Sequence, residues 1–322
     1  MKQIEQMIDK MLAKKIIPGC VYAFVTKDEA EVHVKGMMNK KDRMAVDAVF
    51  DLASLTKVIG TTTVILQLIE EGRLTLDDAV ANYLPIQNKQ LTIQNLLTHT
   101  SDFQGYIVNR DQLKAQPLAQ ALLTEMQPGE NRGNVVKYSD INFLYLGWII
   151  EHLEQCPVQE AIMQRVIQPL HLQTMTFQPK KEKCAPTEGT LQGSVHDPKT
   201  QRLQAHSGSA GLFSNMNDLI IFVQCYLNGG SPLLKQSTIE KLSQSYSNSE
   251  RPYSLGWNLE TINHHYVLTH TGYTGTYLLI DLKENTSFIF LSNRIHPVDD
   301  KENYLLYRDQ LIQTYIQERE NN

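Results

Sequence analysis

The chain has 322 residues, of which 42% are hydrophobic and 20% are charged, and its formal net charge at pH 7 is −5. This composition is typical of an ordinary globular protein, and the length favours either one domain of two lobes or two domains. The weak negative charge is spread along the chain without a basic stripe, which argues against nucleic acid and acidic membrane surfaces as partners.

The cysteines and the N-terminus bear on the compartment in which the chain works. Four cysteines lie far apart and form no C-x-x-C pair: Cys20, Cys156, Cys184 and Cys225. This spacing predicts free thiols, which fit a reducing compartment, rather than a zinc site or a disulfide framework. The first 15 residues hold no uninterrupted apolar run, and no stretch reaches the roughly 18 to 20 apolar residues of a membrane span. We therefore expect a cytoplasmic protein, or an extracytoplasmic one if the sequence is a trimmed piece of a longer chain.

Helix and strand patterns follow one another in a simple order along the chain. Apolar residues at helical spacing predict an amphipathic helix over the first dozen residues, which stops before Pro18. Residues 20–26 are mostly apolar and residues 31–36 alternate valine with polar side chains, so both segments are predicted strands. Helical patterns fill the middle of the chain, at 54–71, 92–99, 138–155 and 214–230. Strand patterns return at 253–260, 265–270, 275–282 and 287–293, before a final helix over 299–317.

This order predicts an α+β fold in which the two ends of the chain build one lobe. Strands from both ends are expected to form an antiparallel sheet flanked by the terminal helices, with an all-helical lobe inserted between them. The α/β lobe is expected from about 1–50 and 231–322, and the helical lobe from about 51–230. No internal repeat or low-complexity segment interrupts the sequence.

The stretch DLASLTKV, residues 51–58, places a serine and a lysine three positions apart at the start of a predicted helix. The spacing puts Ser54 and Lys57 on one helix face. Backbone N–H groups and the dipole at a helix start can stabilise a serine alkoxide or an oxyanion. Burial would lower the pKa of Lys57 and free it to accept the serine proton. An S-x-x-K also arises by chance, and a capping serine followed by an exposed lysine would look the same.

Two further motifs lie downstream of the serine. In KYSDINF, Tyr138 precedes a predicted helix, where a tyrosine near a cation can lose or relay a proton. An aromatic side chain that packs at a helix start would also explain it. In LTHTGYTGT, a predicted edge strand carries His270, Thr271 and Gly272. A glycine there would let a substrate backbone lie against the strand, whereas a solvent-facing histidine beside a turn is the plain structural alternative.

In chain order, S-x-x-K, Y-S-D and H-T-G resemble the serine β-lactamase and penicillin-binding-protein superfamily, specifically its class C-like branch of β-lactamases, D-Ala-D-Ala carboxypeptidases and esterases. The resemblance extends over about residues 21–291, through segments such as LTIQNLLTHTSDF, YSDINFLYLGWIIE and GSVHDPKTQRLQAHSGSAGLFSNMNDL. It implies a single domain over 1–322 with a β-lactamase/transpeptidase-like fold and a site in the cleft between two lobes. It implies no metal and no organic cofactor.

The resemblance also implies a role for each motif residue. Ser54 would be the nucleophile, with Lys57 and Tyr138 sharing the acid–base work. The backbone N–H groups of Ser54 and Tyr273 would form the oxyanion hole. Four positions would line the substrate: Asp140, His270, Thr271 and Gly272.

Asp140 departs from the family's pattern, because it stands where Y-x-N has an asparagine. An ionised carboxylate cannot donate a hydrogen bond to a substrate carbonyl, whereas an asparagine can. Asp140 could instead pair with Lys57, which would hold the lysine charged and make it a worse base. A shifted alignment, with Ser139 and Asp140 standing for the S-D-N of the class A type, is disfavoured because the residues that follow match the Y-x-N branch.

His270 is the second departure, because it replaces the lysine of K-T-G. Histidine is mostly neutral at pH 7, so recognition of a substrate carboxylate should be weaker than in β-lactamases. If His270 does bind a carboxylate, its contribution should grow as the pH falls through about 6.5, where imidazole becomes charged.

These residues predict a serine hydrolase that acts through an acyl-enzyme on an ester or a D-amino-acid amide, with weak or no β-lactamase activity. Its substrate would be a small acyl compound or a peptidoglycan-like molecule. The alternative is a penicillin-binding-like module that captures a ligand with negligible turnover. The physiological substrate and the oligomeric state do not follow from the sequence.

Overall fold

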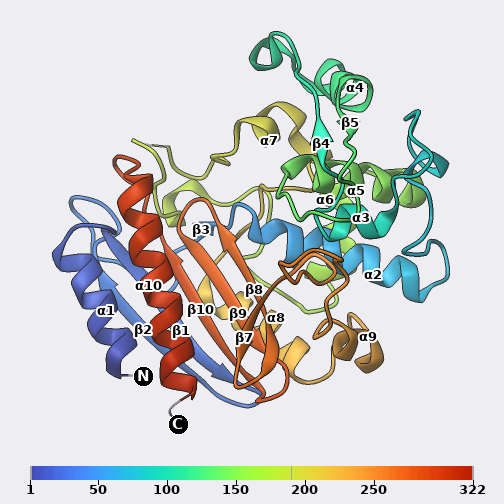
Figure 1. Cartoon of the computed structure of the whole chain (residues 1–322). Helices are drawn as coiled ribbons and strands as arrows, with labels where there is room; N and C mark the ends of the chain where they lie inside the picture. Colours follow the sequence, from blue (N-terminus) through green and yellow to red (C-terminus); the bar gives the residue numbers. More distant parts are fainter. Residues whose placement is uncertain (1, 190, 321–322) are drawn as a thin grey trace.

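The computed structural model describes residues 2–189 and 191–320, and a six-stranded antiparallel sheet occupies one side of the molecule (Figure 1). From one edge to the other, the strands are β2 (Ala30–Gly36), β1 (Gly19–Thr26), β10 (Thr286–Ser292), β9 (Thr276–Asp281), β8 (His265–Gly272) and β7 (Asn258–Ile262). The two N-terminal strands join the four C-terminal ones through β1 and β10, which pair antiparallel. The predicted antiparallel sheet built from both ends of the chain is therefore confirmed.

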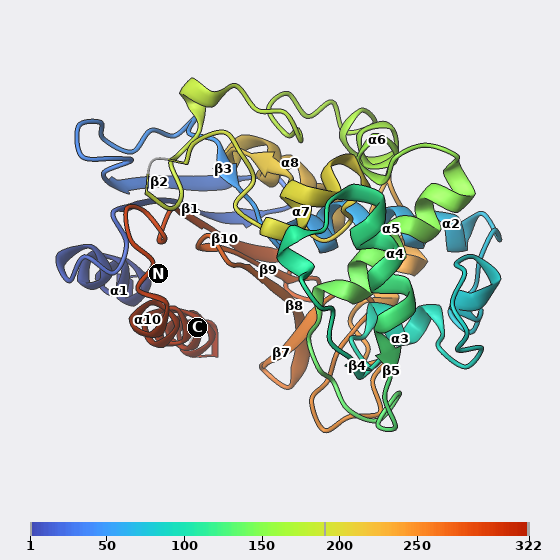
Figure 2. The same cartoon turned by 90° about the horizontal axis from the view of Figure 1, so that it is seen from above.

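Both faces of this sheet are covered by helices. Figure 2 shows α1 (Lys2–Ala13) and α10 (Lys301–Glu320) on one side and α8 (Met216–Leu227) on the other. This explains why the sequence of β1 is mostly apolar. Successive side chains of a strand point to opposite faces, and here both faces are buried. Tyr22 belongs to the core beneath α1 and α10, whereas Val21 belongs to the core shared with α8.

The middle of the chain is mainly helical and packs beside the sheet (Figure 1). The π-helical segments are η1 (Lys57–Thr62), which continues into α2 (Thr63–Glu70), and η4 (Met163–Ile167). The other α-helices of this part are α3 (Ile93–Leu97), α4 (Ala115–Glu125), α5 (Asp140–Glu154), α6 (Val158–Ile162), α7 (Pro198–Leu203) and α9 (Gln236–Lys241). The short 3-10 turns are η2 (Val80–Asn82), η3 (Arg110–Gln112), η5 (Lys181–Lys183) and η6 (Gln204–His206). Two short strand pairs complete the fold: β3 (Phe50–Asp51) with β6 (Phe213–Ser214), and β4 (Phe103–Gln104) with β5 (Gln127–Pro128).

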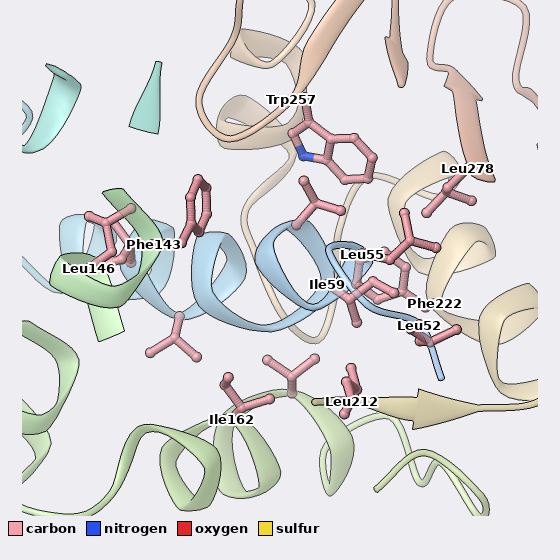
Figure 3. Close-up of a cluster of buried hydrophobic side chains, with 14 of the residues drawn as sticks. Leu52, Leu55, Ile59, Phe143, Leu146, Ile162, Leu212, Phe222, Trp257 and Leu278 are labelled. Carbon is pink, nitrogen blue, oxygen red and sulfur yellow. The ribbon is translucent and has the colours of Figure 1, made fainter. Parts of the chain in front are cut away.

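The helix formed by η1 and α2 runs through the largest hydrophobic core. Figure 3 shows buried side chains of this helix, of the residues just before it and of the segments packed around it: Leu52, Leu55, Ile59, Phe143, Leu146, Ile162, Leu212, Phe222, Trp257 and Leu278. Burial on all sides fixes this helix in place, since interiors are close-packed and tolerate little displacement. The residues just before it are therefore held between the two parts of the molecule.

The predicted helices and strands are present, but several of their ends differ. The strand predicted over 253–260 begins only at Asn258, and the helix predicted from residue 54 starts with a π-helical segment at Lys57. The division into lobes near residues 50 and 230 stays a prediction. We note that α8, which falls in the range predicted for the helical lobe, contacts β1 and β10.

The cysteines are free thiols, and three of the four are buried: Cys20, Cys184 and Cys225. This agrees with the prediction from their spacing. Of the helices within residues 2–189 and 191–320, none combines the length and the apolar character that crossing a membrane requires. The compartment stays a prediction.

Candidate active site

Ser54 lies in a tight turn between β3 and the helix that follows it. Ala53, the residue before it, has a φ of 46°, a left-handed value that is uncommon for alanine. The buried carboxylate of Asp51 holds the turn, accepting hydrogen bonds from the Ala53 N–H at 2.9 Å and the His196 N–H at 2.8 Å. Burial outweighs these two bonds and raises the pKa of Asp51 to about 6.

Lys57 is completely buried, and three oxygen atoms surround its side-chain nitrogen. Its Nζ lies 2.8 Å from Ser54 Oγ, 2.9 Å from Asp140 Oδ1 and 2.9 Å from the carbonyl oxygen of Ser209. An ammonium would donate to all three. A neutral amine would donate to the two acceptor-only oxygens and keep its lone pair for the Ser54 hydroxyl proton.

The charge state of Lys57 is set by its neighbours. Burial disfavours the ammonium, but the Asp140 carboxylate and, to a smaller degree, the Tyr138 hydroxyl outweigh burial and raise the pKa of Lys57 above its ordinary value. The expectation that burial would lower this pKa is therefore wrong. The alternative interpretation, in which Asp140 pairs with Lys57 and holds it charged, agrees with the structure.

Asp140 is the first residue of α5 and binds two lysines at once. Its second oxygen, Oδ2, lies 2.9 Å from Lys199 Nζ, and Lys199 also contacts Asp197 Oδ2 at 3.2 Å. Burial would raise the pKa of Asp140, but Lys57 and Lys199 together hold it well below the usual range. Two lysines and two aspartates thus form a cluster whose formal charges cancel.

Tyr138 lies beside this cluster on the solvent side, and 47% of its surface is exposed. The Lys57 nitrogen lies 5.2 Å from the centre of its ring. The buried His99 ring lies tilted against the Tyr138 ring, with the two ring centres 4.4 Å apart. Its Nδ1 accepts a hydrogen bond from the Ser139 N–H at 3.2 Å and lies 2.8 Å from the Asn142 side-chain nitrogen. His99 therefore fixes the chain that carries Tyr138.

The H-T-G segment ends β8, and its histidine is buried rather than exposed to solvent. Strand β8 lies inside the sheet beside β7, so the predicted edge position is wrong for the strand as a whole. However, β7 begins at Asn258, which pairs with Thr269, so residues 270–272 extend beyond the end of β7. Burial and, to a smaller degree, the Lys57 charge lower the pKa of His270 to about 3, so the expected titration near pH 6.5 is also wrong.

The turn after β8 packs directly against the Ser54 turn. The Thr274 hydroxyl donates to the Asp51 carbonyl at 2.6 Å. A side chain at Gly272 would place its Cβ 2.6 Å from the Leu52 carbonyl oxygen, so glycine is required for this close approach. The predicted role of Gly272 toward a substrate backbone remains a prediction beside this packing role.

Arg294 and Asp299 hold Tyr273 in this turn. Arg294, nearly fully buried, donates from Nε to the Tyr273 carbonyl at 2.7 Å, and its guanidinium lies 4.4 Å from the Tyr273 ring centre. Asp299 pairs with Arg294 and accepts the Tyr273 hydroxyl at 2.5 Å. The N–H groups of Ser54 and Tyr273, the predicted oxyanion hole, donate no hydrogen bond to any group in residues 2–189 and 191–320.

Two cavities meet at Tyr138. The larger, of about 660 Å³, lies toward the helical part and is lined by Tyr138, Asp140, Lys199 and much of the loop 105–112. The smaller, of about 160 Å³, lies toward the sheet and is lined by Tyr138, His270 and Thr271. The larger volume is in the range of small-molecule sites.

The structure thus brings the residues of all three motifs to one place, although they are more than 200 residues apart at the extremes. The sequence reasoning missed Lys199, Asp51, His99 and Arg294. Lys199 lies within a segment that carried the resemblance, so a lysine there was a visible signal, but nothing in its spacing pointed to Asp140. The other three had no signal that distinguishes them from ordinary core or loop residues.

Comparisons with known proteins agree with this geometry. The sequence model of the β-lactamase family matches residues 4–312. A putative D-alanyl-D-alanine carboxypeptidase of Escherichia coli (strain K12) is 28% identical over 325 residues, covering 83% of this chain and 74% of that protein. An N-acetylmuramyl-L-alanine amidase of Bacillus subtilis (strain 168) is 28% identical over 370 residues, covering 94% and 83%. A class C β-lactamase from Rhodobacter sphaeroides superposes with a TM-score of 0.76 at 18% identity, over 97% of this chain and 99% of that one, which shows a shared fold.

Proposed function

Because the chain belongs to the β-lactamase family, we propose that it is a serine hydrolase that forms an acyl-enzyme at Ser54. The observation that carries the proposal is the 2.8 Å contact between Ser54 Oγ and the buried Lys57 nitrogen, beside Tyr138 and two backbone N–H groups that have no hydrogen-bond partner in the described part of the chain. A nucleophile next to a titratable partner, with donors ready for an oxyanion, is the arrangement that acyl transfer needs.

The reaction would proceed in two steps. Ser54 Oγ attacks the substrate carbonyl while its proton passes to the Lys57–Tyr138 pair, and the N–H groups of Ser54 and Tyr273 bind the resulting oxyanion. The tetrahedral intermediate collapses, the leaving group takes a proton from the same pair, and water then hydrolyses the acyl-enzyme. The charged form of Lys57 stabilises the serine alkoxide, and its neutral form can accept the proton.

For the substrate we propose an ester or an amide next to an alanine residue, of the kind found in peptidoglycan. The two curated relatives support this choice, because their names refer to D-alanyl-D-alanine and to muramyl-L-alanine. We expect poor or no hydrolysis of penicillins and cephalosporins. His270 is buried with its pKa lowered to about 3, so it offers no cation to a β-lactam carboxylate.

The second candidate function is ligand capture without turnover, as in a penicillin-binding module. One observation favours it: Asp140 raises the pKa of Lys57, so the neutral amine that would serve as base is scarce at neutral pH. A protein with this site could acylate slowly and release its acyl group more slowly still.

One experiment separates these candidates. The protein is incubated with a fluorophosphonate and with a chromogenic acyl ester, and the intact mass and the released product are measured. The hydrolase predicts a single adduct with the fluorophosphonate and repeated turnover of the ester, whereas the binding module predicts an adduct with no more than one equivalent of product. Absence of both would contradict both candidates.

The nucleophile is tested with Ser54→Ala, and the exposed serine variant Ser245→Ala serves as a matched control. Ser54→Ala should abolish labelling and leave the fold intact, because it removes one small hydroxyl whose hydrogen bond is with Lys57 Nζ. Labelling that persists in this variant would show that another serine is the nucleophile.

A further inference from the structure

Lys199 lines the larger cavity, and one N–H of its ammonium group has no hydrogen-bond acceptor among the described residues. It is the second residue of α7, its side chain is 24% exposed, and it lines the cavity together with Tyr138 and Asp140. An ammonium has three N–H donors. Contacts with Asp140 at 2.9 Å and Asp197 at 3.2 Å account for two of these donors. No other group within residues 2–189 and 191–320 accepts the third, which is therefore left for a ligand.

The cavity wall at Lys199 carries no net formal charge. Among the residues that line the cavity, Arg110 and Lys199 are balanced by Asp111 and Asp140. A carboxylate brought to Lys199 would also meet the Asp140 carboxylate, which is paired with this lysine at 2.9 Å, so an anion gains little. A neutral oxygen that accepts one hydrogen bond, such as an amide carbonyl, fits a donor whose charge is already compensated.

We propose that Lys199 is a specificity-determining residue that donates a hydrogen bond to an amide carbonyl in the acyl half of the substrate. It takes over the donor function that Asp140 cannot perform, because an ionised carboxylate has no hydrogen to give. Asp140 in turn orients the Lys199 ammonium through Oδ2 while it binds Lys57 through Oδ1. This inference rests on the proposed function and names the kind of acyl group that the site prefers, an acylamino or peptidyl group rather than a plain alkyl chain.

The cavity supports an acyl group of this kind. Its volume of about 660 Å³ is roughly four times that of the hollow beside His270, at about 160 Å³, so the larger half of the substrate belongs on the Lys199 side. Four apolar side chains also line the cavity and suit an apolar substituent next to the amide: Ile107, Leu122, Met126 and Ile141.

Two p-nitrophenyl esters of equal chain length test this inference, one of N-acetylglycine, which contains an amide, and one of pentanoic acid, which does not. The measured quantity is the ratio of kcat/KM for the two esters, because any effect of a variant on the Ser54 chemistry is common to both and cancels. Lys199→Met removes the donor, and Lys199→Gln keeps one. Both variants are uncharged and similar in length, so they disturb the Asp140 ion pair alike. Lys183→Met, at an exposed lysine that pairs with Asp47, is the control.

In Lys199→Met the preference for the N-acetylglycyl ester should fall by about 10- to 100-fold, as expected for a lost hydrogen bond to a charged donor. Lys199→Gln should retain part of the preference, and Lys183→Met all of it. A preference that is unchanged in Lys199→Met, or that falls equally in Lys199→Met and Lys199→Gln, would overturn the donor role. If the wild-type protein is acylated by neither ester, the proposed function itself fails, a result distinct from an unchanged ratio.

Discussion

Asp140 and Asp51 are two carboxylates beside the same Ser54 turn, yet their pKa values are displaced in opposite directions. Asp140 contacts two lysine ammonium groups, and its pKa lies well below the usual range. Asp51 accepts two backbone N–H bonds, and burial raises its pKa to about 6. Burial acts on both groups in the same sense, so the difference shows that full positive charges overcome desolvation here, whereas two neutral donors do not.

The two regions also differ in what they do for Ser54. The Asp140 region sets the charge on Lys57, which in the proposed mechanism determines when the serine proton can leave. The Asp51 region sets position, because it fixes the Ala53 N–H and receives Thr274 from the turn that carries Tyr273. Substitutions in the Asp140 region should therefore change the pH dependence of activity. Substitutions in the Asp51 region should change the free energy of unfolding and the position of the proposed oxyanion hole.

The largest effect is expected from Lys57→Ala, which removes the group bonded to Ser54 Oγ. The rate of acylation by a chromogenic ester should fall by about 10² to 10⁴-fold, the usual worth of general acid–base help, while ester binding changes far less. Stopped-flow acylation kinetics measure this, with Lys183→Ala as the control. An unchanged acylation rate would remove Lys57 from the mechanism.

Asp51→Asn tests the second region. A carboxyl whose pKa is higher in the folded state contributes stability that is complete below about pH 4 and is lost as the pH rises through about 6. Relative to Asp51→Asn, the wild type should lose up to about 3 kcal/mol of unfolding free energy over that window. Urea unfolding at several pH values between 4 and 7 measures the difference, and a difference that stays constant with pH would contradict the assignment.

Asp140→Asn should show the opposite trend. Because the folded-state pKa of Asp140 is lowered, its contribution is present above about pH 4 and is lost as the pH falls further. We expect the variant to be less stable at pH 7 by about 1 to 3 kcal/mol, below the range for fully buried pairs because the Asp140 side chain is 29% exposed. Loss of the carboxylate should also lower the pKa of Lys57 and move the acidic limb of the kcat/KM profile to lower pH. A limb that stays in place would show that Asp140 does not control Lys57.

Arg294→Met should affect the oxyanion hole through Tyr273, whose carbonyl loses the Arg294 hydrogen bond. We expect kcat for an ester to fall by roughly tenfold, less than the loss of an oxyanion donor itself, with KM nearly unchanged. Arg73→Met, at a surface ion pair with Glu71 and Glu154, is the control. A loss carried by KM instead of kcat would argue that Arg294 does not position Tyr273.

The smallest effect is expected at His270. Its pKa of about 3 keeps the imidazole neutral across the assay range, so the pH profile of acylation between pH 5 and 8 should have the same shape in the wild type and in His270→Gln. An inflection near pH 6.5 that is present only in the wild type would show that His270 titrates there after all.

The sequence by itself determined the features that depend on neighbouring residues. The period of 2 in residues 31–36 and the helical spacing before Pro18 each specify a local element, and both elements are present. The S-x-x-K spacing likewise brings Ser54 and Lys57 into contact within one helical turn. These predictions succeeded because each needed only the geometry of a short segment.

Only the tertiary structure decided the charge on Lys57, the burial of His270 and the donor at Lys199. Asp140 is 83 residues from Lys57 along the chain, and its second partner comes from a different helix again. The pKa of a buried group depends on the few charges within hydrogen-bonding distance, and sequence spacing does not say which distant charges those are. The edge position predicted for β8 was wrong because the sequence does not say which strands lie side by side. Strand β7 pairs with β8 up to Thr269 and leaves only residues 270–272 beyond its end.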